Sequence, residues 1–168
     1  MPQVYISIGS NLGDRKSYFK FAAKELLIDD RIRDLKRSPV YETEPVGGEG
    51  QPRYWNAVWS FETELPAAVL LKRMHDIEAA AGRQRVAANE ARVLDLDILF
   101  YGKKILRRLP FTIPHPRLHE RAFVLVPFCD LAPEFIHPAL NKSMRQLLEE
   151  YRALHGGIHG VERVVADA

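Results

Sequence analysis

Residues 92–100 read RVLDLDILF, a run of valine, leucine and isoleucine that two aspartates interrupt. Side chains two positions apart on a strand share a face, so Asp95 and Asp97 are expected to lie side by side, roughly 6–7 Å apart along the strand. The residues expected to point the other way, into a core, are Leu94, Leu96, Ile98 and Phe100. Two such carboxylates repel each other and are costly to bury without a cation. The pair therefore indicates a charged sheet edge, a salt-bridged pair or a metal site.

Hydrophobic periodicity around this stretch predicts three further strands and two helices. The expected elements are strands at 4–8, 32–41 and 54–63, a helix after the N-cap residue Asp14, and a helix between Pro66 and Gly82. Their order, β-α-β-β-α-β, is that of the ferredoxin-like sandwich. We therefore expect the α+β class, with an antiparallel sheet that carries both helices on one face and leaves the other face free for a site.

The last third of the chain is less regular, and we expect it to form an irregular C-terminal extension. Residues 109–123 contain too many prolines for a regular element. Short helices are predicted at 121–130 and 143–154, and the inward face of the second should comprise Leu147, Leu148, Tyr151 and Leu154. The last dozen residues are expected to be poorly anchored. Residues 1–168 are expected to form a single domain.

The composition is that of an ordinary globular protein and restricts the classes of function. Apolar residues make up 46% of the 168 residues and charged residues 27%, with a net charge of +2. That charge is too small to favour bulk nucleic-acid binding, and no apolar stretch has the length of a membrane span. There is one cysteine, Cys129, and the first residues lack the pattern of a signal peptide. We expect a cytoplasmic monomer that binds neither nucleic acid nor membrane.

Three arginines lie close to the aspartates in the sequence, namely Arg83, Arg85 and Arg92. The planar guanidinium group suits the oxygens of carboxylates and of phosphates. In one interpretation the arginines neutralise the aspartates. In the other, the aspartates hold Mg²⁺ and the arginines hold the phosphates of a nucleotide, because Mg²⁺ commonly uses one or two carboxylates together with substrate phosphates. The spacing alone leaves both interpretations open.

Two further features permit either a structural or a functional interpretation. The glycine-rich residues 47–50, GGEG, lack the Lys-Ser/Thr ending of a P-loop, so this loop is either a solvent loop or a lid over a site. Tyr54 and Asn56 are expected on one face of a strand, where a ring and an amide could stack on a flat heterocycle and hydrogen-bond its edge. A sheet surface covered by a loop has the same pattern.

Five segments of the chain together resemble one enzyme family. They are YISIGSNLGDR at 5–15, YETEPVG at 41–47, QPRYWNAV at 51–58, RVLDLDILFYG at 92–102 and IPHPRLHERAFVLVP at 113–127. In this order they resemble the 6-hydroxymethyl-7,8-dihydropterin pyrophosphokinases of folate biosynthesis, over most of the chain. Many members of that family have a Trp-Gly-Pro-Arg ending before the aspartates, whereas this chain has Asn-Glu-Ala-Arg at 89–92.

The resemblance implies a ferredoxin-like fold, two Mg²⁺ ions, and transfer of the pyrophosphoryl group of ATP to the hydroxymethyl group of 6-hydroxymethyl-7,8-dihydropterin, with release of AMP. It assigns the metal ions to Asp95 and Asp97, and catalytic roles to Arg83, Arg92 and Asp97. The implied pterin site comprises Thr43, Val46, Tyr54, Asn56, Asp95 and Phe123. The implied ATP site comprises Glu78, Arg83, Arg85, Arg92, Ile98, Thr112, His115 and Arg121. Loops 42–52 and 83–92 would be lids.

Two other classes of function remain open. RNA-recognition modules share the β-α-β-β-α-β order and stack bases on strand aromatics, although two aspartates on the exposed sheet face would repel phosphates. Another two-metal nucleotidyl transferase could use the same fold, because a fold does not determine a function. The combination of Tyr54, Asn56 and Phe123 favours a pterin as the substrate.

Overall fold

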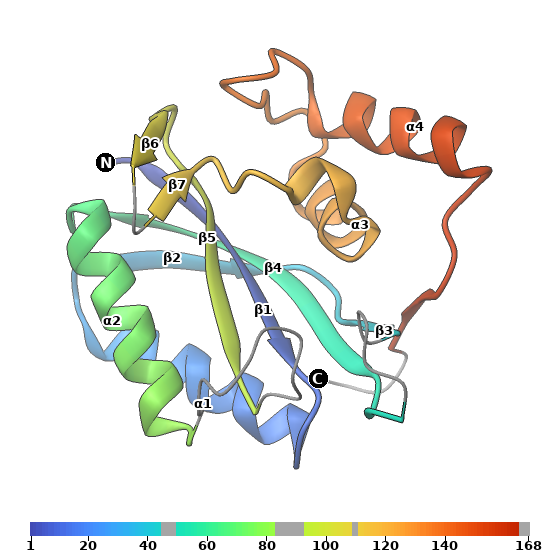
Figure 1. Cartoon of the computed structure of the whole chain (residues 1–168). Helices are drawn as coiled ribbons and strands as arrows, with labels where there is room; N and C mark the ends of the chain where they lie inside the picture. Colours follow the sequence, from blue (N-terminus) through green and yellow to red (C-terminus); the bar gives the residue numbers. More distant parts are fainter. Residues whose placement is uncertain (45–49, 83–92, 109–110, 165–168) are drawn as a thin grey trace.

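A six-stranded antiparallel sheet forms the centre of the molecule (Figure 1). The computed structural model describes residues 1–44, 50–82, 93–108 and 111–164. The strands follow the order β5-β1-β4-β3-β8, and β2 also pairs with β4. Their bounds are Gln3–Ser10 for β1, Ile32–Arg37 for β2, Tyr41–Thr43 for β3, Tyr54–Thr63 for β4, Asp95–Tyr101 for β5 and Val161–Arg163 for β8. The central strand β1 thus pairs with both β4 and β5.

Four α-helices, one 3₁₀ helix and a small hairpin complete the described part of the fold. The α-helices are α1 (Arg15–Ile28), α2 (Ala67–Ala80), α3 (Ala122–Leu131) and α4 (Met144–His155), and the 3₁₀ helix spans Leu118–Glu120. The hairpin consists of β6 (Leu106–Arg108) and β7 (Phe111–Ile113). Each of the described helices is too short or too polar to cross a bilayer.

Polar side chains set the helix boundaries, because the first N–H groups of a helix lack partners within it. The Asp14 carboxylate accepts a hydrogen bond from the backbone N–H of Ser17 at 3.2 Å, as expected for the N-cap of α1. At the start of α4, Ser143 and Gln146 each accept the other's backbone N–H, with distances of 3.1 and 2.8 Å. This capping box fixes where α4 begins. Gly156 ends α4 in the left-handed conformation, with φ 69°.

Helices cover both faces of the sheet, which corrects the expectation of one open face. α1 and α2 pack on one face over a core that includes Ile6, Trp59 and Met74. α3 and α4 lie on the other face, as Figure 1 shows, over a second core that includes Tyr5 and Phe128. α3 is apolar on nearly all sides, so its periodicity did not reveal that it covers the sheet. Both α3 and α4 leave part of this face partly exposed, and the aspartates of β5 lie there.

A bulge in β5 overturns the expected direction of Phe100. Ile6 pairs with Ile98 and Tyr5 pairs with Phe100, so Leu99 is an extra residue on β5. A bulge of this kind shifts the alternation of side chains beyond it. Leu94, Leu96 and Ile98 face the core under α1 and α2, as expected. The fully buried Phe100 instead belongs to the second core, on the same face of the sheet as the aspartates.

The expected second strand is divided, and the C-terminal third is more regular than predicted. β2 ends at Arg37 and β3 begins at Tyr41, because Pro39 has no N–H for a sheet ladder. The proline-rich stretch contains β7, and β8 pairs with β3 near the end of the chain. Leu154 is 80% exposed rather than inward. The last turn of α4 extends past α3, the helix it packs against (Figure 1).

Phe100→Ala is expected to lower the free energy of unfolding by about 3–5 kcal/mol, because a fully buried ring leaves a cavity. The effect should fall on α3, since the rings of Phe100 and Phe128 meet edge to face with centroids 5.5 Å apart. Urea unfolding measures the free energy, and hydrogen exchange locates the loss. A loss below about 1 kcal/mol, or faster exchange confined to α1 and α2, would contradict the assignment of Phe100 to the second core.

Candidate active site

The register of three strands places the candidate residues in one row across the sheet. Gly9 of β1 pairs with Asp95 of β5 on one side and with Asn56 of β4 on the other. Tyr41 of β3 pairs with Asn56 and extends the row. Directly opposed residues of antiparallel strands share a face, so Asp95 and Asn56 lie on one face with Gly9 between them. Asp97 occupies the next row on this face, where it pairs with Ser7.

Gly9 leaves the space between these side chains open. A Cβ atom at this position would lie 3.0 Å from the Oδ1 atom of Asn56 and 3.7 Å from the Cδ1 atom of Tyr54. Because 3.0 Å is closer than nearly all real contacts of this kind, the amide would have to shift. The glycine therefore lets the Asn56 amide lie directly over the backbone of β1.

The Asn56 side chain is oriented by its neighbour on β3. Its Nδ2 atom donates a hydrogen bond to the hydroxyl of Thr43 at 2.6 Å, and Thr43 is buried. With Nδ2 engaged there, Oδ1 faces Gly9. Tyr54 lies two residues before Asn56 on the same face of β4, where it is partly exposed. Three of the expected pterin residues, Thr43, Tyr54 and Asn56, are thus brought together.

The turn between β1 and α1 holds the start of β4, a role that the sequence did not reveal. Asn11 is 1% exposed and donates from Nδ2 to the Pro52 carbonyl at 3.0 Å. Arg15 donates to the next carbonyl, that of Arg53, at 2.8 Å, and its guanidinium lies 5.0 Å from the centre of the Trp55 ring. Two successive peptides before Tyr54 are therefore fixed. The only signal in the sequence was that both donors belong to the quoted segment 5–15.

Glu78 of α2 bonds to the aspartate strand itself. It is 2% exposed, and its Oε2 atom accepts the backbone N–H of Leu96 at 2.8 Å. Leu96 stands between Asp95 and Asp97, so this bond fixes the peptide between Asp95 and Leu96. β5 is the last strand of the described sheet on this side, and Glu78 reaches its outer edge. The structure thus gives Glu78, expected at the ATP site, a contact that positions the strand.

His115 lies beside the aspartates and is held through its backbone and its ring. Its N–H donates to the Leu99 carbonyl at 3.0 Å, and its Nδ1 atom accepts the N–H of Arg117 at 3.2 Å. Burial, which is the largest cause, and the cations Arg121 and Arg117 lower the pKa of His115 to about 4, against the opposing effect of the Asp95 carboxylate. His115 is therefore neutral at neutral pH.

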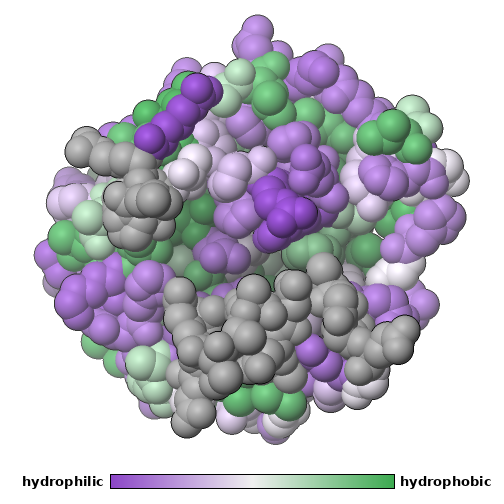
Figure 2. Space-filling model, in the orientation of Figure 1, coloured by the Kyte–Doolittle hydropathy of each residue, from purple (hydrophilic) through white to green (hydrophobic). Residues whose placement is uncertain are grey.

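Arg121 and Phe123 lie at the start of α3. The Arg121 guanidinium lies 5.7 Å from the centre of the Phe123 ring. Arg121 and Asp95 both act on the charge of His115, so both lie near that ring. In Figure 2, hydrophilic residues gather around a hollow in the middle of this view. An aromatic ring and a cation thus lie together at the start of α3.

The structure does not place the remaining expected site residues in the row of Asp95 and Asn56. Ile98 is 6% exposed and its side chain belongs to the core under α1 and α2, so it cannot offer a side-chain contact to a nucleotide. Thr112 lies on β7, opposite Arg107 of β6. The residues that lie outside the described part of the chain are Val46, Arg83, Arg85 and Arg92, and with them loop residues 89–92.

Within the described part of the chain, no three His, Cys, Asp or Glu side chains converge as a metal site. Asp95 and Asp97 nevertheless fit Mg²⁺. This ion prefers carboxylate oxygens and commonly takes one or two of them, with water and substrate phosphates as its remaining ligands. Both side chains lie on one face of an edge strand and are partly exposed. Two carboxylates from the protein are therefore enough to bind Mg²⁺, because water and substrate phosphates can supply the other ligands.

Comparisons with known proteins agree on one family. Residues 5–133 match the family described as 7,8-dihydro-6-hydroxymethylpterin-pyrophosphokinase (HPPK). The 2-amino-4-hydroxy-6-hydroxymethyldihydropteridine pyrophosphokinase of Haemophilus influenzae is 38% identical over 138 residues, which are 82% of this chain and 86% of that protein. The folic acid synthesis protein fol1 of Pneumocystis carinii is 40% identical over 147 residues, which are 88% of this chain and 20% of that protein. This chain thus spans about a fifth of the fungal relatives that it matches.

A solved structure has the same fold. It is described as Plasmodium falciparum HPPK-DHPS wild type with SDX-DHP, and it superposes with a TM-score of 0.73 at 15% identity, covering 99% of this chain and 48% of that one. An identity this low supports the shared fold alone. The family match covers more than half of the sequence, and it agrees with a bacterial relative of similar length. The chain therefore belongs to the 7,8-dihydro-6-hydroxymethylpterin-pyrophosphokinase family.

Proposed function

We propose that this chain transfers the pyrophosphoryl group of ATP to the hydroxymethyl oxygen of 6-hydroxymethyl-7,8-dihydropterin, giving AMP and the pterin diphosphate of folate biosynthesis. The observation that carries the proposal is the row in which Asp95 and Asn56 flank Gly9. It sets a carboxylate that suits a metal ion beside an amide that suits a heterocycle. Membership of the family supports this reaction over an RNA-binding module.

The pterin ring is proposed to bind to Asn56, Tyr54 and Phe123, and the other residues of its site are Thr43, Val46 and Asp95. Because Thr43 engages the Nδ2 atom of Asn56, the Oδ1 atom is left to accept a hydrogen bond from a ring N–H. Tyr54 supplies an aromatic face beside that amide, and Phe123 supplies another from the start of α3. These groups suit a flat ring with a hydrogen-bonding edge.

Asp95 and Asp97 are proposed to hold two Mg²⁺ ions, and Arg83, Arg85 and Arg92 to contact phosphates. When bound, the ions would neutralise charge on the phosphate oxygens during transfer. The chain's own contribution is to fix where these carboxylates stand. Glu78 does this by holding the peptide N–H of Leu96 between them. Glu78 is thus a positioning residue in this proposal.

The remaining ATP contacts are assigned to His115, Arg121, Thr112 and Ile98. His115 supplies hydrogen bonds without charge, because its pKa is about 4. Arg121 supplies the permanent charge, and phosphate oxygens suit its planar group. Ile98 has only its backbone to offer, since its side chain is buried in the core on the other face of the sheet.

We infer that residues 1–168 act as one monomeric domain of ferredoxin-like type in the cytoplasm. The element order β1, α1, β2, β4, α2, β5 supports this type, and so does the sheet order β5-β1-β4 with β2 beside β4. α3, α4 and β8 are additions to that pattern. The single cysteine of the sequence supports a reducing compartment.

Gly9→Ala is expected to raise the KM for the pterin by about tenfold, because small displacements of a positioning group are costly. The KM for ATP should stay within about twofold, since the added methyl group meets Asn56 and Tyr54. Steady-state kinetics with each substrate varied in turn provides the test. Gly9→Ser, which adds a larger group, should have the larger effect. An unchanged KM for the pterin in both variants would contradict the assignment of this row to the pterin.

Asp97→Asn keeps the shape of the side chain and removes the charge that a metal ion needs. We expect turnover to fall by about a hundredfold or more, with unfolding stability unchanged or raised because repulsion from Asp95 is relieved. Asp76→Asn is the matched control, since Asp76 is an exposed residue of α2. Turnover and urea unfolding are measured on both variants. Lost stability with normal activity per folded molecule would show that the aspartate pair is structural.

The nucleotide product tests the reaction itself. Incubation with Mg·ATP and 6-hydroxymethyl-7,8-dihydropterin should yield AMP and the pterin diphosphate in equal amounts, because the hydroxymethyl oxygen attacks the β-phosphorus. Removal of Mg²⁺ by EDTA should abolish the reaction. Chromatographic separation of the nucleotides identifies the product. ADP as the sole nucleotide product would contradict pyrophosphoryl transfer, and absence of pterin-dependent turnover would contradict the whole assignment.

A further inference from the structure

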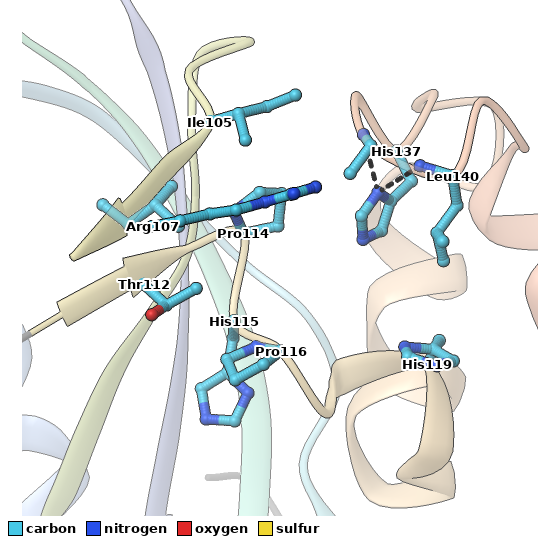
Figure 3. Close-up of a pocket in the computed structure, with 11 residues that line it drawn as sticks. Ile105, Arg107, Thr112, Pro114, His115, Pro116, His119, His137 and Leu140 are labelled. Carbon is cyan, nitrogen blue, oxygen red and sulfur yellow. Dashed lines mark hydrogen bonds between the residues drawn. The ribbon is translucent and has the colours of Figure 1, made fainter. Parts of the chain in front are cut away.

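A cavity of about 460 Å³ lies between the β6–β7 hairpin and the loop between α3 and α4 (Figure 3). Its volume is within the range of small-molecule sites. Thr112 and His115 form part of its wall, but Asp95, Asp97 and Asn56 do not line it. The cavity therefore adjoins the proposed ATP contacts but does not include the row of Asp95 and Asn56.

Most of the cavity wall is apolar and rigid. Pro114 and Pro116 form one side, in the segment that runs from β7 to the 3₁₀ helix. Ile105 and Leu140, which are 46% and 38% exposed, stand on opposite sides of its opening. Proline rings offer a flat surface that loses little side-chain entropy when a ligand binds. This lining suits a flat, apolar molecule.

His137 contributes a buried donor to the cavity. The residue is 4% exposed, and its Nδ1 atom accepts the backbone N–H groups of Ala139 and Leu140, each at 3.1 Å. A neutral imidazole that accepts at Nδ1 carries its proton on Nε2. Burial and the neighbouring His119 lower the pKa of His137, so the ring is neutral at neutral pH. Phe100 meets the ring edge to face at 5.2 Å and fixes its plane.

The Nε2–H group is the remaining donor of this ring, and His137 lines the cavity. An acceptor on a molecule in the cavity can pair with this donor. His137 therefore offers the cavity one directional donor.

Arg107 supplies the charge of the cavity. Its side chain extends from β6 across the cavity toward His137 (Figure 3). The ion pairs found within the described residues do not include Arg107. Its planar, forked group can bind both oxygens of a carboxylate. The rest of the wall is mostly apolar, so the cavity suits a ligand with one charged group for Arg107 and an apolar body.

We propose that this cavity binds a small planar molecule that is apolar over most of its surface and carries one carboxylate group. Arg107 holds the carboxylate, the Nε2–H of His137 donates to it or to a neighbouring acceptor, and the proline rings cover the apolar body. The inference does not rest on pyrophosphoryl transfer. An occupant would nevertheless touch the segment that carries Thr112 and His115.

The test uses naphthalene-2-carboxylate as the probe, titrated into the whole chain and followed by calorimetry and by amide NMR shifts. We expect saturable binding, with shifts in residues 112–116 and 137–140. Arg107→Met should weaken binding by about tenfold or more, because the carboxylate loses its charged partner. Lys103→Met is the matched control, since Lys103 is an exposed cation of the turn before β6 that does not line the cavity. It should leave binding unchanged.

Two further comparisons separate the proposed contacts. Naphthalene-2-carboxamide, which has no charge, should bind about tenfold more weakly than the carboxylate. His137→Asn keeps an acceptor for the Ala139 and Leu140 N–H groups but removes the Nε2–H, and it should weaken the carboxylate about fivefold. If this variant does not fold, Arg107→Met and the carboxamide decide the outcome.

Three results would overturn the proposal. The first is the absence of saturable binding at millimolar probe. The second is equal binding of the carboxylate and the carboxamide, which would remove the role of Arg107. The third is competitive displacement of the probe by a non-hydrolysable ATP analogue with Mg²⁺, because the cavity would then be part of a nucleotide site.

Discussion

The pairing of β1 with both of its neighbours is the constraint on which the rest of the site depends. Because side chains alternate along a strand, a slip of one residue would turn a whole set of them to the other face. The observed register sets Asp95 and Asn56 on either side of Gly9. The glycine then lets the amide approach the backbone, since even one carbon atom there would lie 3.0 Å from Asn56 Oδ1. The register of β1 and the absence of a side chain at Gly9 together bring Asp95 and Asn56 into one row.

Polar contacts from outside the sheet hold the two strands that flank β1. Glu78 reaches the N–H of Leu96, and Asn11 and Arg15 reach two successive carbonyls before β4. A buried carboxylate is costly unless it is well hydrogen-bonded, so Glu78 is a poor choice for stability alone. A hydrophobic contact at that position would pack the helix but would not fix the direction of a peptide. The hydrogen bonds of Glu78, Asn11 and Arg15 therefore serve to position the strands beside β1 more than to stabilise the fold.

Much of the fold follows from local patterns. The alternation in residues 54–63 predicted β4, the N-cap residue Asp14 predicted the start of α1, and the spacing of the two aspartates predicted their shared face. The bulge at Leu99 has no such signal, because an extra leucine in an apolar strand does not change the composition. Phe100 was therefore assigned to the wrong core. The site could be predicted only as far as single strands, since the approach of Asp95 and Asn56 depends on pairing between segments about forty residues apart.

Arginine and histidine have separate roles on this side of the molecule. Burial keeps both His115 and His137 neutral at neutral pH, since the pKa of each is lowered. The positive charge comes instead from Arg121 near His115 and from Arg107 in the cavity, and a guanidinium stays charged at any pH the protein meets. A cationic histidine would lose its charge near pH 6.5 and change the attraction for an anion with it. Neutral histidines next to arginines keep the charge constant, so each histidine contributes direction and each arginine contributes attraction.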